Sequence, residues 1–255
     1  MKISRSLMVL GLLLVMLVLP IMASGSDTLL ADPTVPVSSA VPSLPPAISA
    51  QAAIVTDDVG QVLWSRNADV RMPMASTTKI MTALTVLAGS DDLDRSVTVP
   101  GEAVGVEGSS VYLYEGETLT LGQLLDAVLI ESANDAATAL AIAVAGSVEA
   151  FAGQMNTLAD EMGLVDTHFV NPHGLDDETH YTTARELAQI ARTAMTYDAF
   201  AKTVSTYKKE IPLKGKEGVR LLINHNKLLK MLEGCIGIKT GFTKRSGRCL
   251  VSACT

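Results

Sequence analysis

The segment MASTTKIMTAL, residues 74–84, carries the strongest pattern in this sequence. Its apolar residues recur at helical spacing, so we expect a helix over residues 75–87 that Ser76 caps. Ser76 and Lys79 stand three residues apart, and positions i and i+3 share one face of a helix. The segment therefore predicts that the Ser76 hydroxyl and the Lys79 amine point to the same place.

This serine–lysine pair is a candidate nucleophile and base. A serine hydroxyl is a weak nucleophile until a base takes its proton, and a desolvated lysine with a lowered pKa can be that base. The positive end of the helix dipole would lie beside Ser76. Taken alone, however, the pattern is more typical of a capped amphipathic helix whose Lys79 side chain reaches solvent.

Ser132-Ala133-Asn134 forms a second short motif, between two helical patterns. A serine in a loop can relay a proton to a leaving amine, and the Asn134 amide can hydrogen-bond a peptide group of a substrate. The plainer alternative is a helix cap, in which Ser132 or Asn134 satisfies free backbone N–H groups while Asp135 complements the dipole. The motif alone favours the cap.

The third motif, Lys239-Thr240-Gly241, lies inside a strand-like run. An edge strand can pair with an extended peptide. Gly241 would leave the approach to this strand clear, while Thr240 and Lys239 supply a hydroxyl and a cation for a carboxylate. Alone, the motif is more typical of an exposed strand with a glycine that relieves twist.

The three motifs together are far more specific, because this trio is known from penicillin-binding proteins and class A β-lactamases. The sequence resembles the serine D-Ala-D-Ala carboxypeptidases, the low-molecular-mass penicillin-binding proteins of peptidase family S11. The likeness extends over about residues 47–255. The blocks that carry it are residues 74–84, 107–110 (EGSS), 132–137 (SANDAA), 171–175 (NPHGL) and 237–243 (GIKTGFT).

The resemblance implies acyl transfer on peptidoglycan stem peptides that end in D-Ala-D-Ala. Ser76 would attack the carbonyl of the penultimate D-Ala, with Lys79 as the general base, and water would later hydrolyse the acyl-enzyme. Ser132, steered by Lys239, would pass a proton to the leaving nitrogen. β-Lactam antibiotics would mimic the substrate and react covalently with Ser76.

The resemblance also implies the substrate-binding groups. Asn134 would hold the substrate amide, and Lys239 with Thr240, beside Gly241, would receive the terminal carboxylate. Backbone N–H groups of Ser76 and Phe242 would form the oxyanion hole, whose paired donors stabilise the tetrahedral intermediate. The reaction implied in this way needs no metal and no organic cofactor.

Three other functions remain as alternatives. A β-lactamase on the same fold needs a glutamate that activates water, and Glu178 and Glu186 lie between the second and third motifs. A D,D-endopeptidase acting on cross-linked wall would use the same motifs. A non-catalytic wall-binding module is disfavoured by the presence of Ser76, Lys79 and Ser132.

The composition excludes several classes of protein. The 255 residues are 48% hydrophobic and 18% charged, which fits one or two folded domains rather than disorder. A net charge of −7 with only 4% aromatic residues disfavours nucleic-acid binding. Three cysteines are too few for a disulfide scaffold.

The N-terminal region predicts export. Residues 1–25 combine early positive charge, an apolar run and small residues, which is the order of a secretory signal peptide. The alternative is an uncleaved segment that anchors the chain to a membrane. Residues 26–46 are rich in proline and serine, and we interpret them as an extended linker. We therefore expect residues 47–255 to be an extracytoplasmic catalytic domain of a bacterial protein.

Strand patterns occur near both ends of this domain and helical patterns between them. We expect strands over residues 47–55, 61–65, 208–213, 219–223, 236–243 and 248–253, and helices over 75–87, 119–130, 134–144, 148–162 and 183–197. This order predicts an α+β fold, β-lactamase/transpeptidase-like, whose terminal strands share one antiparallel sheet. Members of the resembled family continue with another strand and a closing helix, so we expect the sequence to be truncated at its C-terminus.

Histidines and cysteines complete the candidates. His168, His173, His180 and Asp176 lack the helical His-x-x-x-His spacing of a zinc peptidase, and we expect no metal there. Residues 171–174 are read as a turn in which His173 is hydrogen-bonded. We expect partly buried thiols, with a cross-strand disulfide between the first and the last as the alternative. The cysteines are Cys235, Cys249 and Cys254.

Overall fold

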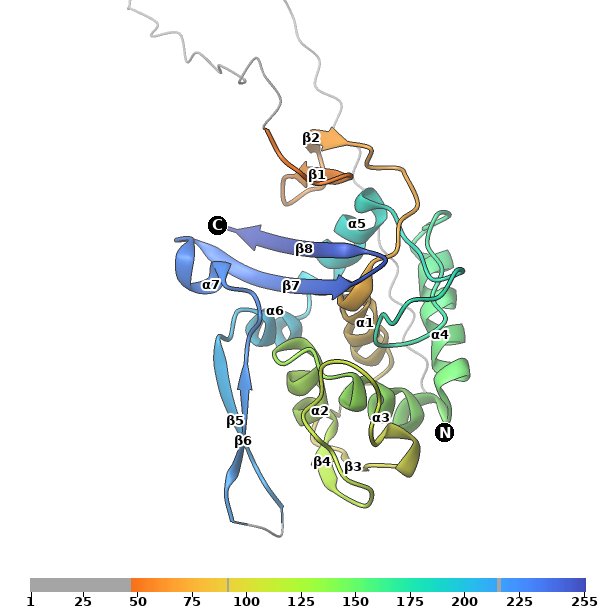
Figure 1. Cartoon of the computed structure of the whole chain (residues 1–255), viewed down its shortest axis with the longest axis vertical. Helices are drawn as coiled ribbons and strands as arrows, with labels where there is room; N and C mark the ends of the chain where they lie inside the picture. The colour runs from red at the N-terminus through yellow and green to blue at the C-terminus, as the bar shows by residue number, and fades with distance from the viewer. Residues whose placement is uncertain (1–46, 91, 215–216) are drawn as a thin grey trace, which may run out of the picture. The chain divides into compact units, whose positions relative to one another are not determined.

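The structure, a computed structural model, describes residues 47–90, 92–214 and 217–255 (Figure 1). The signal peptide and the linker predicted over residues 1–46 lie outside the described residues, as do residues 215–216 between two predicted strands. Residues Ile48–Thr255 form a single structural unit, and every predicted site residue belongs to it.

Strands stand near both ends of this unit and helices fill the middle, as the sequence predicts. The strands are β1 (Ala53–Thr56), β2 (Val62–Arg66), β3 (Ser96–Thr98), β4 (Thr118–Thr120), β5 (Lys208–Pro212), β6 (Val219–Ile223), β7 (Cys235–Thr243) and β8 (Gly247–Cys254). The helices are α1 (Lys79–Gly89), α2 (Leu121–Leu129), α3 (Asn134–Ala145), α4 (Val148–Glu161), α5 (Ala184–Met195), α6 (Asp198–Val204) and α7 (Leu228–Met231), with 3₁₀ turns η1 (Ala75–Thr78) and η2 (Gly101–Ala103).

Capping residues fix where several helices begin. Thr120 and Gln123 form a reciprocal capping box at α2, and Thr183 caps α5 by accepting a bond from the Glu186 N–H. The predicted Ser76 cap is wrong. The helix begins one turn early as η1, no side chain caps it, and the Ser76 hydroxyl bonds to a lysine instead.

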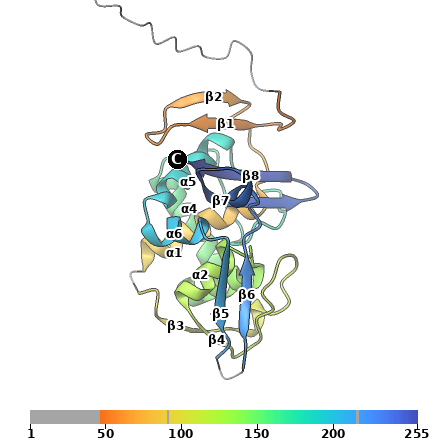
Figure 2. The same ribbon diagram turned by 90° about the vertical axis from the view of Figure 1, so that its left-hand side faces the viewer.

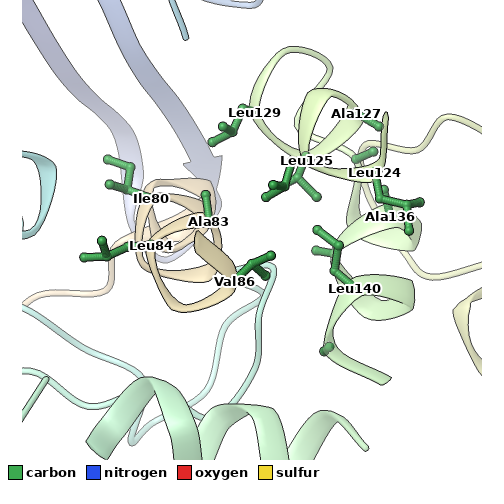
Figure 3. Packing of buried hydrophobic residues seen from close by; sticks show 14 of the residues in the cluster. Ile80, Ala83, Leu84, Val86, Leu124, Leu125, Ala127, Leu129, Ala136 and Leu140 are labelled. Carbon is green, nitrogen blue, oxygen red and sulfur yellow. The ribbon is translucent and has the colours of Figure 1, made fainter. Parts of the chain in front are cut away.

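Helix α1 is central to the core. Its residues from Lys79 to Leu87 are all buried. Figure 3 shows side chains of α1, α2 and α3 pointing toward one another, with Val86, Leu125 and Leu140 among them. Burying each large aliphatic side chain contributes about 1.5–3 kcal/mol, so this packing holds the first turn of α1 firmly in place.

The α+β prediction is confirmed, but the strand pairing differs in one respect. The described residues form four separate two-stranded antiparallel sheets, β1–β2, β3–β4, β5–β6 and β7–β8. The terminal hairpins β1–β2 and β7–β8 therefore share no hydrogen-bonded ladder, although we expected a single sheet. Figures 1 and 2 show hairpin β1–β2 lying over α5. Residue alternation identifies a strand, but it does not determine which edges meet.

The β7–β8 hairpin places the cysteines. Cys235 and Cys254 are paired positions at its open end, as predicted. All three thiols are free, and Cys254 is exposed rather than partly buried, because it is the last residue of β8.

One further property concerns membranes. Across the described residues no single helix is long and apolar enough to span a bilayer, and only the pair α3 and α4, bent by 81°, passes that test together.

Candidate active site

The site begins at the 3₁₀ turn η1. Ala75 adopts a φ of 47°, a left-handed conformation that non-glycine residues rarely take. This bend turns the chain abruptly into α1 and leaves Ser76 half-buried, while its neighbours in the turn are buried. Hydroxyl bonds from Thr77 to the Met74 carbonyl (2.5 Å) and from Thr78 to the Ala75 carbonyl (2.7 Å) close the turn.

Lys79 lies directly beneath Ser76 and is fully buried. Its Nζ donates to Ser76 Oγ (3.0 Å), Asn134 Oδ1 (2.6 Å) and the His173 carbonyl (2.6 Å). The alternative that Lys79 reaches solvent is therefore wrong. Burial, reinforced by the charge of Lys239, holds the Lys79 pKa well below its usual value. The neutral amine keeps two N–H groups, enough for Asn134 and the His173 carbonyl, and its lone pair can then accept the Ser76 proton.

The Ser132–Asn134 motif lies between α2 and α3, facing Lys79 and Lys239. Ser132 has a φ of 64° and is buried, and its hydroxyl accepts a bond from Lys239 Nζ at 2.8 Å. The N-cap of α3 is Ala133, which has no capping side chain. The alternative that Ser132 or Asn134 merely caps a helix is therefore wrong.

The third motif lies on β7, which runs past the start of α1 (Figure 1). Lys239 is buried, so the reading of an exposed strand residue is wrong for it. Burial lowers the Lys239 pKa to about 7, against the charge of Glu131, which raises it. Thr240 is half-buried, and the Phe242 side chain is exposed.

Gly241 allows β7 to approach the nucleophile turn. A Cβ at this position would lie 2.9 Å from Ser76 N, which is closer than real Cβ atoms come, and 3.1 Å from Thr77 N. The space beside Gly241 that we expected to be open to a peptide is thus occupied in part by the nucleophile turn. The close contact places the backbone of β7 beside Ser76.

Hydrogen bonds therefore join all three motifs. Ser76 is bonded to Lys79, Lys79 to Asn134, and Ser132, two residues earlier, to Lys239. Residues far apart in the chain thus converge on one site.

Two groups support the site in ways that the sequence did not predict. The turn over residues 171–174 is present as predicted, with His173 bonded in it, and the His173 carbonyl receives the Lys79 bond. Burial, together with the charge of Lys79, lowers the His173 pKa to about 3. The NPHGL block was a visible signal for this contact. Every residue has a backbone carbonyl, however, so residue identity could not show that this one binds Lys79.

Asp135 is the second missed group. Its buried carboxylate accepts bonds from Ser110 Oγ (2.6 Å), Val111 N (3.2 Å) and Leu113 N (3.0 Å). It thus holds the loop before β4 beside the Ser132–Asn134 motif, rather than only complementing the helix dipole.

In the described parts of the chain, no group of three or more His, Cys, Asp or Glu residues is arranged to hold a metal ion. Two of the four candidates face other partners: His180 Nε2 lies 2.8 Å from Thr78 Oγ1, and His168 Nδ1 lies 2.6 Å from the Thr179 carbonyl.

With this geometry established, comparison with known proteins identifies the family. Residues 39–255 match the family model Peptidase_S11, described as D-alanyl-D-alanine carboxypeptidase. This chain belongs to the S11 family.

Relatives of this S11 chain include two curated enzymes named D-alanyl-D-alanine carboxypeptidase. DacF of Bacillus subtilis is 34% identical over 206 residues, covering 79% of this chain and 53% of DacF. An enzyme of Streptomyces sp. strain K15 is 36% identical over 246 residues, covering 90% of this chain and 84% of that enzyme. The chain thus spans about half the length of one S11 relative and most of the other.

A solved structure confirms the fold. The crystal structure of the Streptomyces K15 DD-transpeptidase aligns with a TM-score of 0.76 at 36% identity, covering 82% of this chain and 86% of that one.

The two glutamates weighed for a β-lactamase lie differently in this S11 chain. Glu178 is exposed. Glu186 is buried, and its carboxylate accepts bonds from Asp166 N (3.0 Å) and Thr167 Oγ1 (2.5 Å). Glu186 is thus committed to holding the chain before α5.

Proposed function

We propose that this chain is a serine D-Ala-D-Ala carboxypeptidase that removes the terminal D-Ala from peptidoglycan pentapeptide stems through an acyl-enzyme on Ser76. One observation carries the proposal: the fully buried Lys79 Nζ lies 3.0 Å from Ser76 Oγ. A lysine deprived of water gives up its charge more readily, and it can then accept the hydroxyl proton.

Acylation begins with proton transfer from Ser76 Oγ to the neutral Lys79 amine. The oxygen forms a bond to the carbonyl carbon of the penultimate D-Ala, and the carbonyl oxygen becomes an oxyanion. The backbone N–H groups of Ser76 and Phe242 serve as the oxyanion hole in this proposal, supported by the close packing of β7 against η1. Two fixed donors at such a position commonly lower the activation free energy by several kcal/mol.

Collapse of the intermediate breaks the C–N bond. Ser132 donates its proton to the leaving nitrogen and receives in exchange the proton that Lys79 took from Ser76, so both groups end the step as they began it. The bond from Lys239 Nζ to Ser132 Oγ at 2.8 Å supports this transfer. Lys239 and Thr240 bind the terminal carboxylate beside Gly241, and Asn134 binds the substrate amide. Water then hydrolyses the ester and restores Ser76. The chemistry assigned to these residues calls on no metal or cofactor.

The cellular setting is part of the same proposal. Residues 1–25 act as a signal peptide, residues 26–46 as a linker, and residues 47–255 as the catalytic domain. The enzyme then works outside the cytoplasmic membrane on the bacterial wall and affects wall biogenesis and cell shape. If residues 1–25 are retained, they associate the enzyme with the membrane.

A peptide assay tests the proposal. The chain is incubated with a synthetic peptide that ends in D-Ala-D-Ala and with its L-Ala-L-Ala counterpart, and released alanine is measured. We expect release from the D,D-peptide only, and none from the Ser76→Ala variant. Cleavage confined to cross-linked dimers would instead indicate an endopeptidase, and rapid steady-state hydrolysis of a β-lactam would indicate a β-lactamase. Equal release by Ser76→Ala would contradict the proposal.

A further inference from the structure

The strained turn that carries Ser76 is held from behind by a buried hydrogen-bond chain. The carbonyl of Ala75 accepts a bond from Thr78 Oγ1 at 2.7 Å. Thr78 Oγ1 in turn lies 2.8 Å from Nε2 of His180, a residue 102 positions later in the chain. His180 and Thr78 are 3% and 0% exposed, so water cannot replace either bond.

The direction of each bond in this chain can be assigned. The Val170 N–H donates to His180 Nδ1 at 3.1 Å, so Nδ1 is the acceptor of the neutral ring and Nε2 carries the proton. Nε2 therefore donates to Thr78 Oγ1. The single hydroxyl proton of Thr78 is left for the Ala75 carbonyl, and every donor has one acceptor.

Residues 172–174, which precede His180 in the chain, contact the turn and α1 at further points. Gly174 packs so closely that a Cβ on it would lie 1.9 Å from the Ala75 carbonyl oxygen. The Pro172 carbonyl accepts a bond from Thr82 Oγ1 at 2.6 Å. Residues 172–174 thus support Ala75 and α1 through their backbone, whereas the imidazole supports the Ala75 carbonyl through the Thr78 side chain.

We propose that His180 is a positioning residue for Ser76: its neutral imidazole, acting through Thr78 on the Ala75 carbonyl, keeps the nucleophile turn in its reactive geometry, and protonation of the ring releases that turn. The inference rests on the proposed acyl-enzyme on Ser76 and extends it. Neither His180 nor Thr78 takes a chemical step. Both act only through the position of Ser76.

Protonation would remove the bond that orients the ring toward Thr78. A charged ring carries a hydrogen on Nδ1 as well, and that hydrogen would face the Val170 N–H, so the bond between them is lost. Burial lowers the His180 pKa to about 4. The exposed carboxylates of Asp177 and Asp176 oppose this shift, whereas His168 adds to it.

The sign of the pH effect follows from the lowered pKa. An unfolded histidine titrates near about 6.5, so between about 6.5 and about 4 only the unfolded chain takes up this proton. The contribution of His180 to stability is complete above that window and is lost as the pH falls through it. Below about 4 the folded protein also binds the proton, and the turn loses its support.

Matched variants separate positioning from general stability. In His180→Gln the amide nitrogen replaces Nε2 as a donor to Thr78 and does not titrate, whereas His180→Phe keeps the ring volume without any donor. Thr78→Ser keeps the bridging hydroxyl, and Thr78→Val removes it at nearly constant shape. His168→Gln changes the half-buried histidine of the same segment and serves as the control.

The readout is the second-order rate constant for acylation by a fluorescent penicillin, measured on the full chain at each pH with circular dichroism as a check on folding. At neutral pH we expect His180→Phe and Thr78→Val to acylate about 100-fold more slowly, the loss typical of a displaced reactive group. His180→Gln and Thr78→Ser should stay within about threefold of the native chain, and His168→Gln should match it.

The acid limb gives the decisive comparison. Below about pH 4 the native rate should fall more steeply with pH than the His180→Gln rate, because His180 adds a second protonation to that of Lys79. The inference would be overturned if the native and His180→Gln rates fell equally steeply below about pH 4. Unchanged acylation by folded His180→Phe and Thr78→Val would also overturn it. A native chain that penicillin does not acylate at all would instead refute the proposed function.

Discussion

Two buried lysines distinguish this site at the scale of single residues. Lys79 and Lys239 are both almost fully buried, yet they have different neighbours. Lys79 has the charge of Lys239 nearby, which lowers its pKa further, whereas Glu131 supports the charge on Lys239. The pair thus supplies one amine suited to accept a proton and one that is charged below about pH 7.

The Lys239 pKa of about 7 predicts a pH limit on substrate binding. Lys239 is charged below this value and neutral above it, so its attraction for a terminal carboxylate should weaken as the pH rises through about 7. Lys239→Arg keeps the charge and should move this limb to higher pH. The measurement is KM for a D-Ala-D-Ala peptide as a function of pH. If KM rises at the same pH in both proteins, a group other than Lys239 causes the rise.

Residue identity predicted the groups that meet at the candidate site and missed those that hold them. Ser76, Lys79, Ser132, Asn134 and the third motif were found because each motif is contiguous. The partner of Thr78 lies 102 residues away, and the support from residues 171–174 is a carbonyl common to every residue. Such contacts depend on how the chain returns to the site, which spacing within a motif does not record.

At the scale of elements, η1 lies between β7 on one side and residues 168–182 on the other. Gly241 permits the first contact and Gly174 the second. Long, strongly periodic helices were predicted to within about two or three residues. Strands β3 and β4, with three residues each, and helices α6 and α7 were missed because they are too short to show a period.

Substitution of Gly174 should separate crowding from backbone strain. Gly174 and Gly163 both have positive φ, 89° and 73°, but a Cβ at Gly163 would meet nothing within 4 Å. Gly163→Ala should therefore cost only the left-handed strain, about 1–2 kcal/mol. Gly174→Ala should lower the free energy of unfolding by about 1–3 kcal/mol more, and it should slow acylation of Ser76.

Denaturant unfolding of both variants checks this prediction, together with their penicillin acylation rates. Equal losses of stability in the two variants would show that the contact with the Ala75 carbonyl is not tight.

At the scale of the whole molecule, ion pairs between distant segments hold the site region together. Arg220 of β6 bonds both oxygens of Glu117, at 2.8 and 3.1 Å, and donates to the Val111 carbonyl at 2.8 Å. These side chains are 11% and 3% exposed. The pair thus fastens hairpin β5–β6 to the loop that Asp135 holds beside the active site.

Removal of one charge from this pair should be strongly destabilising. Glu117→Gln leaves the Arg220 charge buried without its partner, and breaking such a pair costs about 3–5 kcal/mol. The control is Glu210→Gln. Glu210 pairs with Lys208 at 3.6 Å, and both side chains are about half exposed, so loss of this pair should lower the free energy of unfolding by at most about 1 kcal/mol. Chemical denaturation measures both losses, and equal effects would show that Arg220 finds another partner.

The most direct test of the central claim is mass spectrometry of the intact chain after exposure to benzylpenicillin. We predict one penicilloyl group, attached to Ser76, that is absent from Ser76→Ala. In Lys79→Met, which keeps the side-chain length without the amine, the adduct should form about 10²–10⁴-fold more slowly, as expected when a general base is lost. An adduct on another residue, or equal labelling of Ser76→Ala, would contradict the account.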